Sequence, residues 1–412
     1  MKLGLAAIDA VCERLDRPER RFESALVAGT NGKGSTAATL ASIAQAGGLA
    51  TGLYTSPHLI DSTERIRIGD ADVSPEELDA ALEETFAAAD RAPGVPLTYF
   101  EAMTSAAFVC FARRRLDLAV LEVGLGGRYD ATNVVPASLS VVTSIALDHV
   151  EELGPTIESI SGEKAGIFRS GRPALVESAK VEARRVFRDA AERAGAVLHE
   201  LVDEVRIDGL QITLSDSRFR LTTPVREYSL LTPLLGAHQA RNAATGVRAA
   251  ELLPGSRAIG EEAIARGVRS VRWPGRLERF RVRDGIVFLD GCHNPAGASA
   301  LAEFLDATGL RPDLVFGAMA DKDVEGMFAP LAGRARRIRI VPIGSPRAAT
   351  PNEIRQRVGA ARSDTQASDS VGAAIQELLG ARSAETIIVA GSLYLVGEAR
   401  AVLLSGRFDG AS

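Results

Sequence analysis

The sequence predicts an α/β fold in two parts: an N-terminal P-loop domain on a parallel sheet with a small antiparallel insert, and a smaller C-terminal Rossmann-like α/β domain. Short apolar runs alternate with amphipathic segments of helix length through most of the 412 residues, as in a parallel sheet covered by helices. The alternation changes period between residues 205 and 230 and restarts after Trp273-Pro274-Gly275. We therefore expect domains at 1–273 and 274–412.

The elements of the first domain follow from the hydrophobic pattern. Strands are expected at 25–28, 49–54, 118–123 and 139–145, and helices at 34–46, 75–91, 101–114, 236–253 and 259–268. The runs 118–123 and 139–145 are nearly all apolar, which is typical of central strands covered on both faces. In the insert, apolar and polar residues alternate on both sides of Asp208-Gly209, which predicts a hairpin turn at these two residues.

The second domain repeats the strand–helix alternation. Strands are expected at 286–289, 314–316, 338–342 and 386–390, with helices between them.

Composition excludes several classes of protein. A hydrophobic fraction of 46% and a charged fraction of 25% are those of an ordinary globular chain. A net charge of −5 argues against nucleic acid as a partner. Three widely spaced cysteines cannot form a disulfide framework, and Asp9 interrupts the first apolar stretch too early for an export signal. No run reaches the length that a membrane span needs. A reducing cytosol fits the cysteine usage best, so we expect a cytoplasmic protein. We also expect a monomer with small-molecule partners.

The strongest motif is the segment Gly29-Thr30-Asn31-Gly32-Lys33-Gly34-Ser35-Thr36, which stands between an apolar strand and a helix. A glycine-rich turn directs backbone N–H groups at a polyphosphate, and the helix N-terminus adds its positive dipole end. Lys33 supplies a cation for the β- and γ-phosphates, and Ser35 or Thr36 supplies a hydroxyl for magnesium. Nucleotide binding is therefore expected, but a P-loop alone does not distinguish a motor, a switch, a kinase and a ligase.

Further strings occur in order along almost the entire chain. They are Thr55-Ser56-Pro57-His58-Leu59, Thr98-Tyr99-Phe100-Glu101, Leu121-Glu122-Val123-Gly124-Leu125-Gly126-Gly127-Arg128, Asp130-Ala131-Thr132-Asn133, Leu147-Asp148-His149, Glu163-Lys164-Ala165-Gly166-Ile167, His238-Gln239, Pro274-Gly275-Arg276, Asp290-Gly291-Cys292-His293-Asn294-Pro295 and Asp321-Lys322-Asp323. With these strings the chain resembles the folylpolyglutamate synthase/dihydrofolate synthase family of the Mur-ligase superfamily. The family usually begins with a further helix upstream, whereas Lys2-Leu3-Gly4-Leu5 resembles part of its pterin-side pocket.

The resemblance implies an ATP-dependent ligase that joins L-glutamate to a folate or pteroate carboxylate through an acyl phosphate. It implies two Mg²⁺ ions, with Ser35, Ser56, Glu122, His149 and a carboxylated Lys164 as metal ligands. It also implies Asn242, Arg276, Asp290 and His293 as nucleotide contacts, in addition to the P-loop, with Lys33, Lys164 and His293 as the catalytic set. Thr98, Phe100, Glu101 and Asp130 align with the pterate side.

Without the resemblance, several of these residues have simpler interpretations. Glu163-Lys164 would be a solvated pair on a helix, His149 a loop histidine, and Phe100 a core residue at a helix start. Two alternative functions stay open: another Mur-type ligase, such as a UDP-muramoyl peptide enzyme, and a P-loop ATPase module without ligase activity. The sequence does not distinguish addition of the first glutamate from extension of a glutamate chain.

Overall fold

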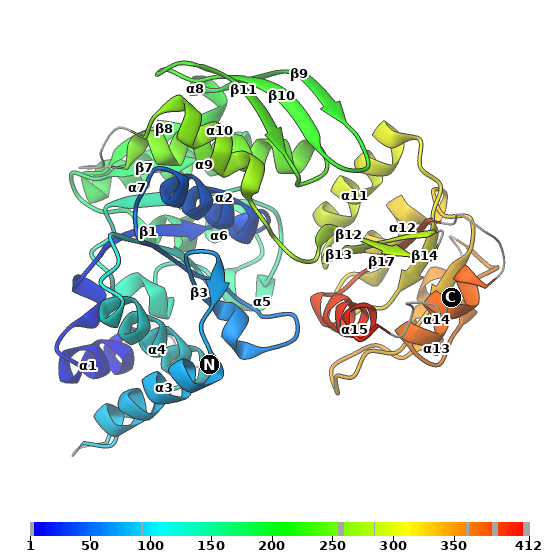
Figure 1. Cartoon of the computed structure of the whole chain (residues 1–412), viewed down its shortest axis with the longest axis horizontal. Coiled ribbons are helices and arrows are strands. Elements are labelled where there is room, and N and C mark those ends of the chain that lie inside the picture. The colour runs from blue at the N-terminus through cyan, green and yellow to red at the C-terminus, as the bar shows by residue number, and fades with distance from the viewer. Residues whose placement is uncertain are drawn as a thin grey trace.

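A computed structural model describes residues 4–91, 94–253, 259–283, 285–359, 362–380 and 386–406 (Figure 1). Lys2 and Leu3, which the sequence associates with the pterin side, lie outside these residues. No helix in the described part of the chain is long and apolar enough to cross a membrane.

The N-terminal domain contains a large sheet. Its strands are β1 (Glu23–Ala28), β2 (Thr51–Tyr54), β3 (Ile66–Ile68), β4 (Ala71–Asp72), β5 (Leu118–Glu122), β6 (Leu139–Val142), β7 (Pro173–Val176) and β8 (Val197–Glu200). They form one eight-stranded sheet in the order β4-β3-β2-β5-β1-β6-β7-β8. The strands from β2 to β8 in this order run parallel, and β3 and β4 add an antiparallel edge.

Helices cover both faces of this sheet. They are α1 (Ala6–Arg14), α2 (Lys33–Ala46), α3 (Pro75–Ala89), α4 (Tyr99–Arg113), α5 (Val150–Leu153), α6 (Ile157–Lys164), α7 (Val181–Ala194), α8 (Leu201–Glu204), α9 (Ala237–Leu252) and α10 (Glu261–Ser270). One core joins α2, α9 and α10 to Ala25 and Val27 of β1, and the other joins α1, α3, α4, α6 and α7 to Leu26 and Ala28. This alternation is why the central strands read as continuous apolar runs.

The antiparallel insert is confirmed, but the position predicted for its turn is wrong. The insert consists of β9 (Arg206–Ile212), β10 (Ser217–Thr222) and β11 (Glu227–Thr232), in the order β11-β10-β9. Asp208 and Gly209 lie inside β9, where Gly209 takes a φ of 63° and the pairing with β10 shifts register. The glycine therefore forms an irregularity within one strand. The chain reverses at residues 213–216 instead, where the Thr213 amide donates to the Asp216 carbonyl at 2.9 Å.

The smaller C-terminal domain is a second α/β unit. Its strands are β12 (Arg276–Val282), β13 (Gly285–Asp290), β14 (Asp313–Phe316), β15 (Ile338–Ile340), β16 (Gln366–Ala367) and β17 (Thr386–Ala390), in the order β12-β13-β17-β14-β15-β16. Its helices are α11 (Pro295–Thr308), α12 (Val324–Ala332), α13 (Pro351–Val358), α14 (Val371–Leu379) and α15 (Leu393–Leu404). Within this domain β12 runs antiparallel to β13, and the other described strand pairs are parallel.

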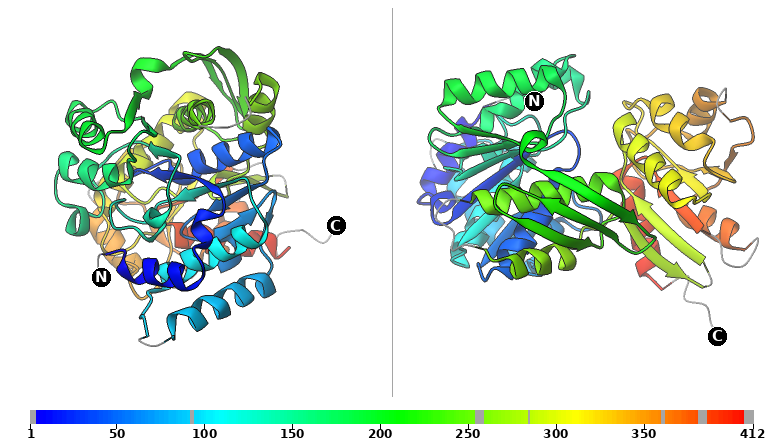
Figure 2. Two further views of the ribbon diagram at one scale, coloured as in Figure 1. Left: turned by 90° about the vertical axis from the view of Figure 1, so that its left-hand side faces the viewer. Right: turned by 90° about the horizontal axis from the view of Figure 1, so that it is seen from above.

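The two domains meet through loops and through the insert. Seen from above, the insert reaches from the larger domain toward the smaller one (Figure 2). Ile212 and Leu214 at the end of β9 pack against the core of the C-terminal domain. The loops after β1, β5, β6 and β13 all leave the carboxyl ends of parallel strands, the edge at which open α/β sheets bind ligands.

Candidate active site

The loop after β1 has the backbone of an anion-binding turn. Gly29 and Gly32 have φ values of 148° and 86°, which residues with a side chain rarely adopt. A Cβ at either position would also overlap a neighbouring side chain. Helix α2 begins at Lys33 without a side-chain cap, so its first N–H groups are available to a phosphate.

Neighbouring strands hold this loop in place. The Thr30 amide donates to the Ser144 carbonyl at 2.8 Å, and the Asn31 carbonyl accepts from the Thr143 hydroxyl at 2.7 Å. Lys33 Nζ donates to the carbonyl oxygens of residues 29 and 30 at 3.2 Å each. The cation is therefore held at the loop by weak neutral acceptors, from which a phosphate could draw it.

The two hydroxyl residues after the loop have different surroundings. Ser35 lines the cavity between the domains. Thr36 is fully buried, and its Oγ1 has no hydrogen-bond partner among the described residues. Of these two candidates, the geometry favours Ser35 as the hydroxyl that meets a ligand.

A buried carboxyl group lies beside the P-loop. Glu122 ends β5, and its Oε2 accepts the backbone N–H of Ser56 at 3.2 Å. Burial raises the pKa of Glu122, whereas the charges of Lys33 and Arg276 act to lower it. The side chain is only 5% exposed, so a cation bound here would replace water as the partner of its charge.

Lys164 is buried, contrary to the solvated pair that Glu163-Lys164 suggests on sequence alone. It ends α6, is 4% exposed, and its Nζ donates to the Gly29 carbonyl at 2.8 Å. Burial and the nearby charge of Lys33 lower its pKa to about 7. Near neutral pH a large part of this side chain is therefore the uncharged amine.

The predicted ligand of a second metal lies at the rim of a small cavity. His149 follows β6 and has a left-handed backbone with φ of 49°. Its side chain is 45% exposed, and burial of the rest lowers its pKa. A cavity of about 40 Å³ is lined by His149 together with Gly29, Lys33, Lys164 and His293.

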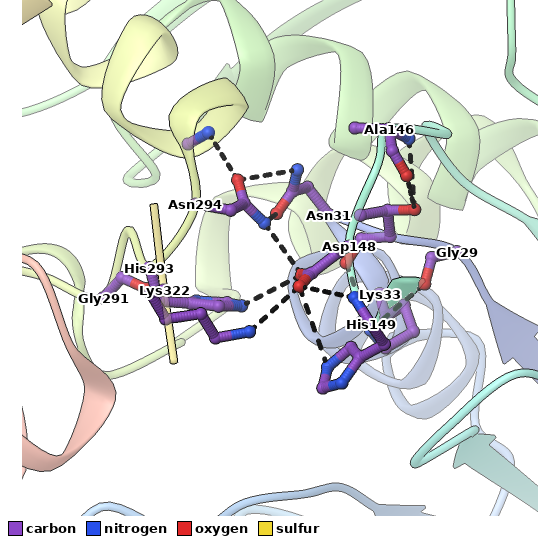
Figure 3. A network of polar contacts seen from close by, with 12 residues as sticks. Gly29, Asn31, Lys33, Ala146, Asp148, His149, Gly291, His293, Asn294 and Lys322 are labelled. Carbon is purple, nitrogen blue, oxygen red and sulfur yellow. Dashed lines mark hydrogen bonds and ion pairs between the residues drawn. The ribbon is translucent and has the colours of Figure 1, made fainter. Parts of the chain in front are cut away.

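A network of polar side chains joins the two domains beside the site. Its residues occur in the family strings, but no role in the site is predicted for them from sequence. Asp148 accepts Lys322 Nζ at 2.9 Å and Asn294 Nδ2 at 3.1 Å, and both partners belong to the C-terminal domain (Figure 3). Burial alone would raise the pKa of Asp148, but Lys322 and the two neighbouring histidines lower it to about 2. The only signal in the sequence was the presence of charged residues within two of the family strings.

The second domain contributes a turn after β13. Asp290 accepts the N–H groups of Leu277 and Cys292 at 3.1 Å each, and so supports the turn that carries His293. Burial lowers the pKa of His293 to about 4, so its ring is neutral at pH 7. His293 Nδ1 lies 2.9 Å from the Gly291 carbonyl. Because a carbonyl only accepts, Nδ1 carries the proton and Nε2 is left as an acceptor.

Both domains line one cavity of about 280 Å³. Its lining joins residues of the P-loop with residues of α9 and the second domain, among them Thr30, Asn31, Gly32, Lys33, Gly34, Ser35, Glu122, Asn242, Arg276, Asp290 and His293. The structure thus brings together nearly all residues that the sequence assigns to the nucleotide. Asn242 sits against the P-loop itself, because a Cβ on Gly32 would overlap its side chain.

The residues assigned to the pterate side lie elsewhere. Thr98 and Glu101 form a reciprocal capping box at the start of α4. The Phe100 ring packs on Tyr54 with centroids 6.1 Å apart. Asp130 is buried and accepts the N–H groups of residues 125 and 132 at 2.9 and 3.0 Å. None of the four predicted residues lines the cavity between the domains.

Comparison with known families agrees with this architecture. Residues 27–250 match the Mur ligase middle domain, and residues 275–393 match the Mur ligase, glutamate ligase domain. These two matches place the chain among the ATP-dependent acid–amino-acid ligases of the Mur type.

Sequence relatives define the class further. A dihydrofolate synthase/folylpolyglutamate synthase of Bacillus subtilis is 36% identical over 97% of this chain and 95% of its own length. The Escherichia coli protein of the same name is also 36% identical, over 99% of this chain and 93% of its own length. The chain belongs to the folylpolyglutamate synthase/dihydrofolate synthase family.

Solved structures resemble the whole chain. A Mycobacterium tuberculosis folylpolyglutamate synthase complexed with ADP and AMPPCP has a TM-score of 0.90 at 32% identity, covering 97% of this chain and 95% of its own. An E. coli protein in complex with DHPP and ADP has a TM-score of 0.88 at 35% identity, covering 99% and 94%. A Yersinia pestis folylpolyglutamate synthase/dihydrofolate synthase with Mn, AMPPNP and L-glutamate has a TM-score of 0.86 at 32% identity, covering 98% and 95%.

Proposed function

We propose that this chain uses ATP to join L-glutamate to the carboxylate of a folate or a pteroate. The observation that carries the proposal is the shared cavity, in which the P-loop faces Arg276 and His293 of the second domain. The nucleotide would be ATP with a bound divalent cation, in line with relatives bound to ADP, AMPPNP and manganese.

The chain's own residues would divide the work on ATP. The free N–H groups at the start of α2 and Lys33 bind the β- and γ-phosphates. Arg276 lines the same cavity from the second domain and would supply a forked cation, and Asn242 and Asp290 would contact the nucleoside. Phosphoryl transfer depends mainly on such positioning and charge neutralisation.

The residues present fit a divalent cation. Glu122 is a buried carboxyl group beside Ser56, and Ser35 lines the same cavity. Among the described residues no group of three or more His, Cys, Asp or Glu is placed to hold a metal, so hydroxyls and phosphate oxygens would complete the shell. When bound, Mg²⁺ would neutralise the charge that develops on the transferred phosphoryl group.

We further propose two metal positions and a carboxylated Lys164. Ser35, Ser56 and Glu122 would hold one ion, and His149 with Lys164 would hold the other. An uncharged amine can add CO₂ and release a proton, which converts Lys164 into an anionic oxygen ligand. Its burial and its lowered pKa of about 7 support this assignment.

The reaction would proceed in two transfers. A substrate carboxylate oxygen attacks the γ-phosphorus, ADP leaves, and an acyl phosphate forms. The amine of L-glutamate then attacks the acyl carbon, and the C–O bond to phosphate breaks to give the amide, phosphate and a proton. Nε2 of neutral His293 would accept a hydrogen bond from the attacking amine, and because the pKa of this ring is about 4 the released proton would pass on to water. Closure of the two domains would exclude water that hydrolyses the acyl phosphate.

The proposed pterate contacts lie outside the shared cavity. Thr98, Phe100, Glu101 and Asp130 are proposed as pterate contacts, although each already has a partner within the protein. We keep the domain limits at 1–273 and 274–412, which the separate sheets and the two matched family regions support. We also propose a cytoplasmic location, which the three free and buried cysteines support, and a monomeric state.

An ADP-release assay tests this function. The enzyme is given ATP, Mg²⁺ and L-glutamate with dihydropteroate, tetrahydrofolate or a UDP-muramoyl substrate in separate reactions. We expect glutamate-dependent ADP release with one or both folate compounds, and the pattern separates first addition from chain extension. Release with the muramoyl compound alone would indicate another Mur-type ligase. Release that ignores glutamate would indicate a P-loop ATPase module.

A further inference from the structure

We propose that Asp148 is a positioning residue, which with Lys322 and Asn294 clasps the C-terminal domain to the P-loop side of the site. The inference rests on the proposed function, and it concerns a residue of a family string to which neither the resemblance nor the comparisons assign a role. We call this set of three side chains the interdomain clasp.

Its first support is the geometry around the carboxylate of Asp148. Oδ1 accepts Lys322 Nζ at 2.9 Å, and Oδ2 accepts Asn294 Nδ2 at 3.1 Å. His293 Nε2 lies 3.9 Å from Oδ2. One carboxylate in the first domain thus contacts three side chains of the second (Figure 3).

Burial makes the central pair stronger than a surface ion pair. The side chains of Asp148 and Lys322 are only 10% and 17% exposed. Surface pairs contribute little because water and salt screen them. A desolvated, hydrogen-bonded pair is screened less, and removal of one member leaves the other charge buried without a partner.

Asn294 links the clasp to the nucleotide loop. Its Nδ2 also donates to Asn31 Oδ1 at 3.0 Å, while its Oδ1 accepts the Gly297 amide at 2.9 Å and caps helix α11. A displacement of Asp148 would therefore also displace the P-loop and the first turn of α11. The turn that carries His293 immediately precedes this cap.

Asp148 also holds the backbone of the proposed metal ligand next to it. Its Oδ1 accepts the backbone N–H of His149 at 3.0 Å. His149 is in the left-handed region, with φ of 49°, a conformation that needs support from its surroundings. The same carboxylate thus fixes the loop that presents His149 and the docking of Lys322.

The test compares Asp148→Asn, Lys322→Met and the double variant with Asp306→Asn. Asp306 is exposed and pairs with Arg334 at 2.5 Å within the C-terminal domain, and neither residue contacts a member of the clasp, so this variant removes a charge and leaves the clasp intact. The measurements are kcat and the KM for ATP in the glutamate-dependent ADP-release assay. Trp273, the single tryptophan of the chain, lines a neighbouring cavity with Arg276 and reports on this region by its fluorescence.

We expect each single variant to lower kcat by roughly 100-fold, the cost typical of reacting groups displaced by about 1 Å. The KM for ATP changes much less than kcat, because hydrogen bonds with Thr143 and Ser144 still hold the P-loop. The double variant loses no more than the single variants, because all three remove the same contact. Lys322→Arg, which keeps the charge, recovers most of the loss, and Asp306→Asn behaves as wild type.

Two results would overturn the proposal: a single variant with near-normal kcat, or losses that multiply in the double variant, which would mean that Asp148 and Lys322 act separately. If the wild type shows no glutamate-dependent ADP release, the proposed function fails, but the clasp is still testable. In that case small-angle scattering of the apoprotein and Trp273 fluorescence should report a more open molecule for both single variants than for Asp306→Asn. Equal scattering and spectra would refute the clasp.

Discussion

Substitution of Lys164 by arginine separates its charge from its capacity to react with CO₂. Arg retains a cation of similar length, but its guanidinium never becomes neutral in a protein. With a pKa of about 7, roughly three quarters of Lys164 is neutral at pH 7.5, compared with about one in a thousand for an ordinary lysine. The site therefore raises the reactive fraction by a factor of roughly 700.

The expected loss follows from the role of the carboxylated side chain as an oxygen ligand. Removal of one electrostatic contact to developing charge typically costs roughly 100- to 1,000-fold in kcat. We expect a loss in that range for Lys164→Arg and for Lys164→Met, with nucleotide binding still measurable because Lys33 is intact. Lys180→Arg, at an exposed lysine, serves as the matched control.

Two assays check this expectation. The first is ADP release from pH 6 to 9: the wild-type kcat should fall as pH drops through about 7, because the protonated amine cannot bind CO₂. The second is ¹³C NMR after exposure to ¹³CO₂, which should show a carbamate signal in the wild type and none in Lys164→Arg. Near-normal turnover of Lys164→Arg, or no carbamate signal in active wild-type enzyme, would refute the reasoning.

Three further predictions concern stability and nucleotide binding. Burial raises the pKa of Glu177 to about 7 from the ordinary 4.5. The contribution of this residue to the free energy of unfolding is therefore complete below pH 4.5 and is lost as pH rises through 7. In urea unfolding, Glu177→Gln should remove up to about 3 kcal/mol of this loss between pH 4 and pH 8; an unchanged pH dependence would contradict this. Gly34→Ala places a Cβ against the indole ring of Trp273, so it should lower the free energy of unfolding by about 1–3 kcal/mol in thermal unfolding. Gly162→Ala, with open space around its Cβ, should not. Arg276→Lys should lower kcat/KM for ATP by about 10-fold or more through loss of forked contacts, while Arg281→Lys on the exposed side of β12 should be neutral.

Local sequence was sufficient for the elements that carry the phosphate site. The apolar run before Gly29 and the helix after Lys33 follow from period and turn chemistry, and the structure has β1 and α2 there. Asp208-Gly209 shows where such reasoning fails. The dipeptide suits a tight turn, yet pairing of β9 with β10 keeps it inside a strand. Interactions between strands overrode a local preference.

The sequence by itself determined which groups this protein has for its chemistry: a phosphate loop, a hydroxyl, a carboxyl group, a lysine and a second domain with Arg276 and His293. Only the tertiary structure decided the state of those groups. Lys164 reads as a solvated residue along the chain, but folding removes it from water beside Lys33, which lowers its pKa to about 7. Asp148 meets Lys322 across 174 positions of sequence. Neither outcome is visible locally, because burial and charge pairing are properties of the folded surroundings.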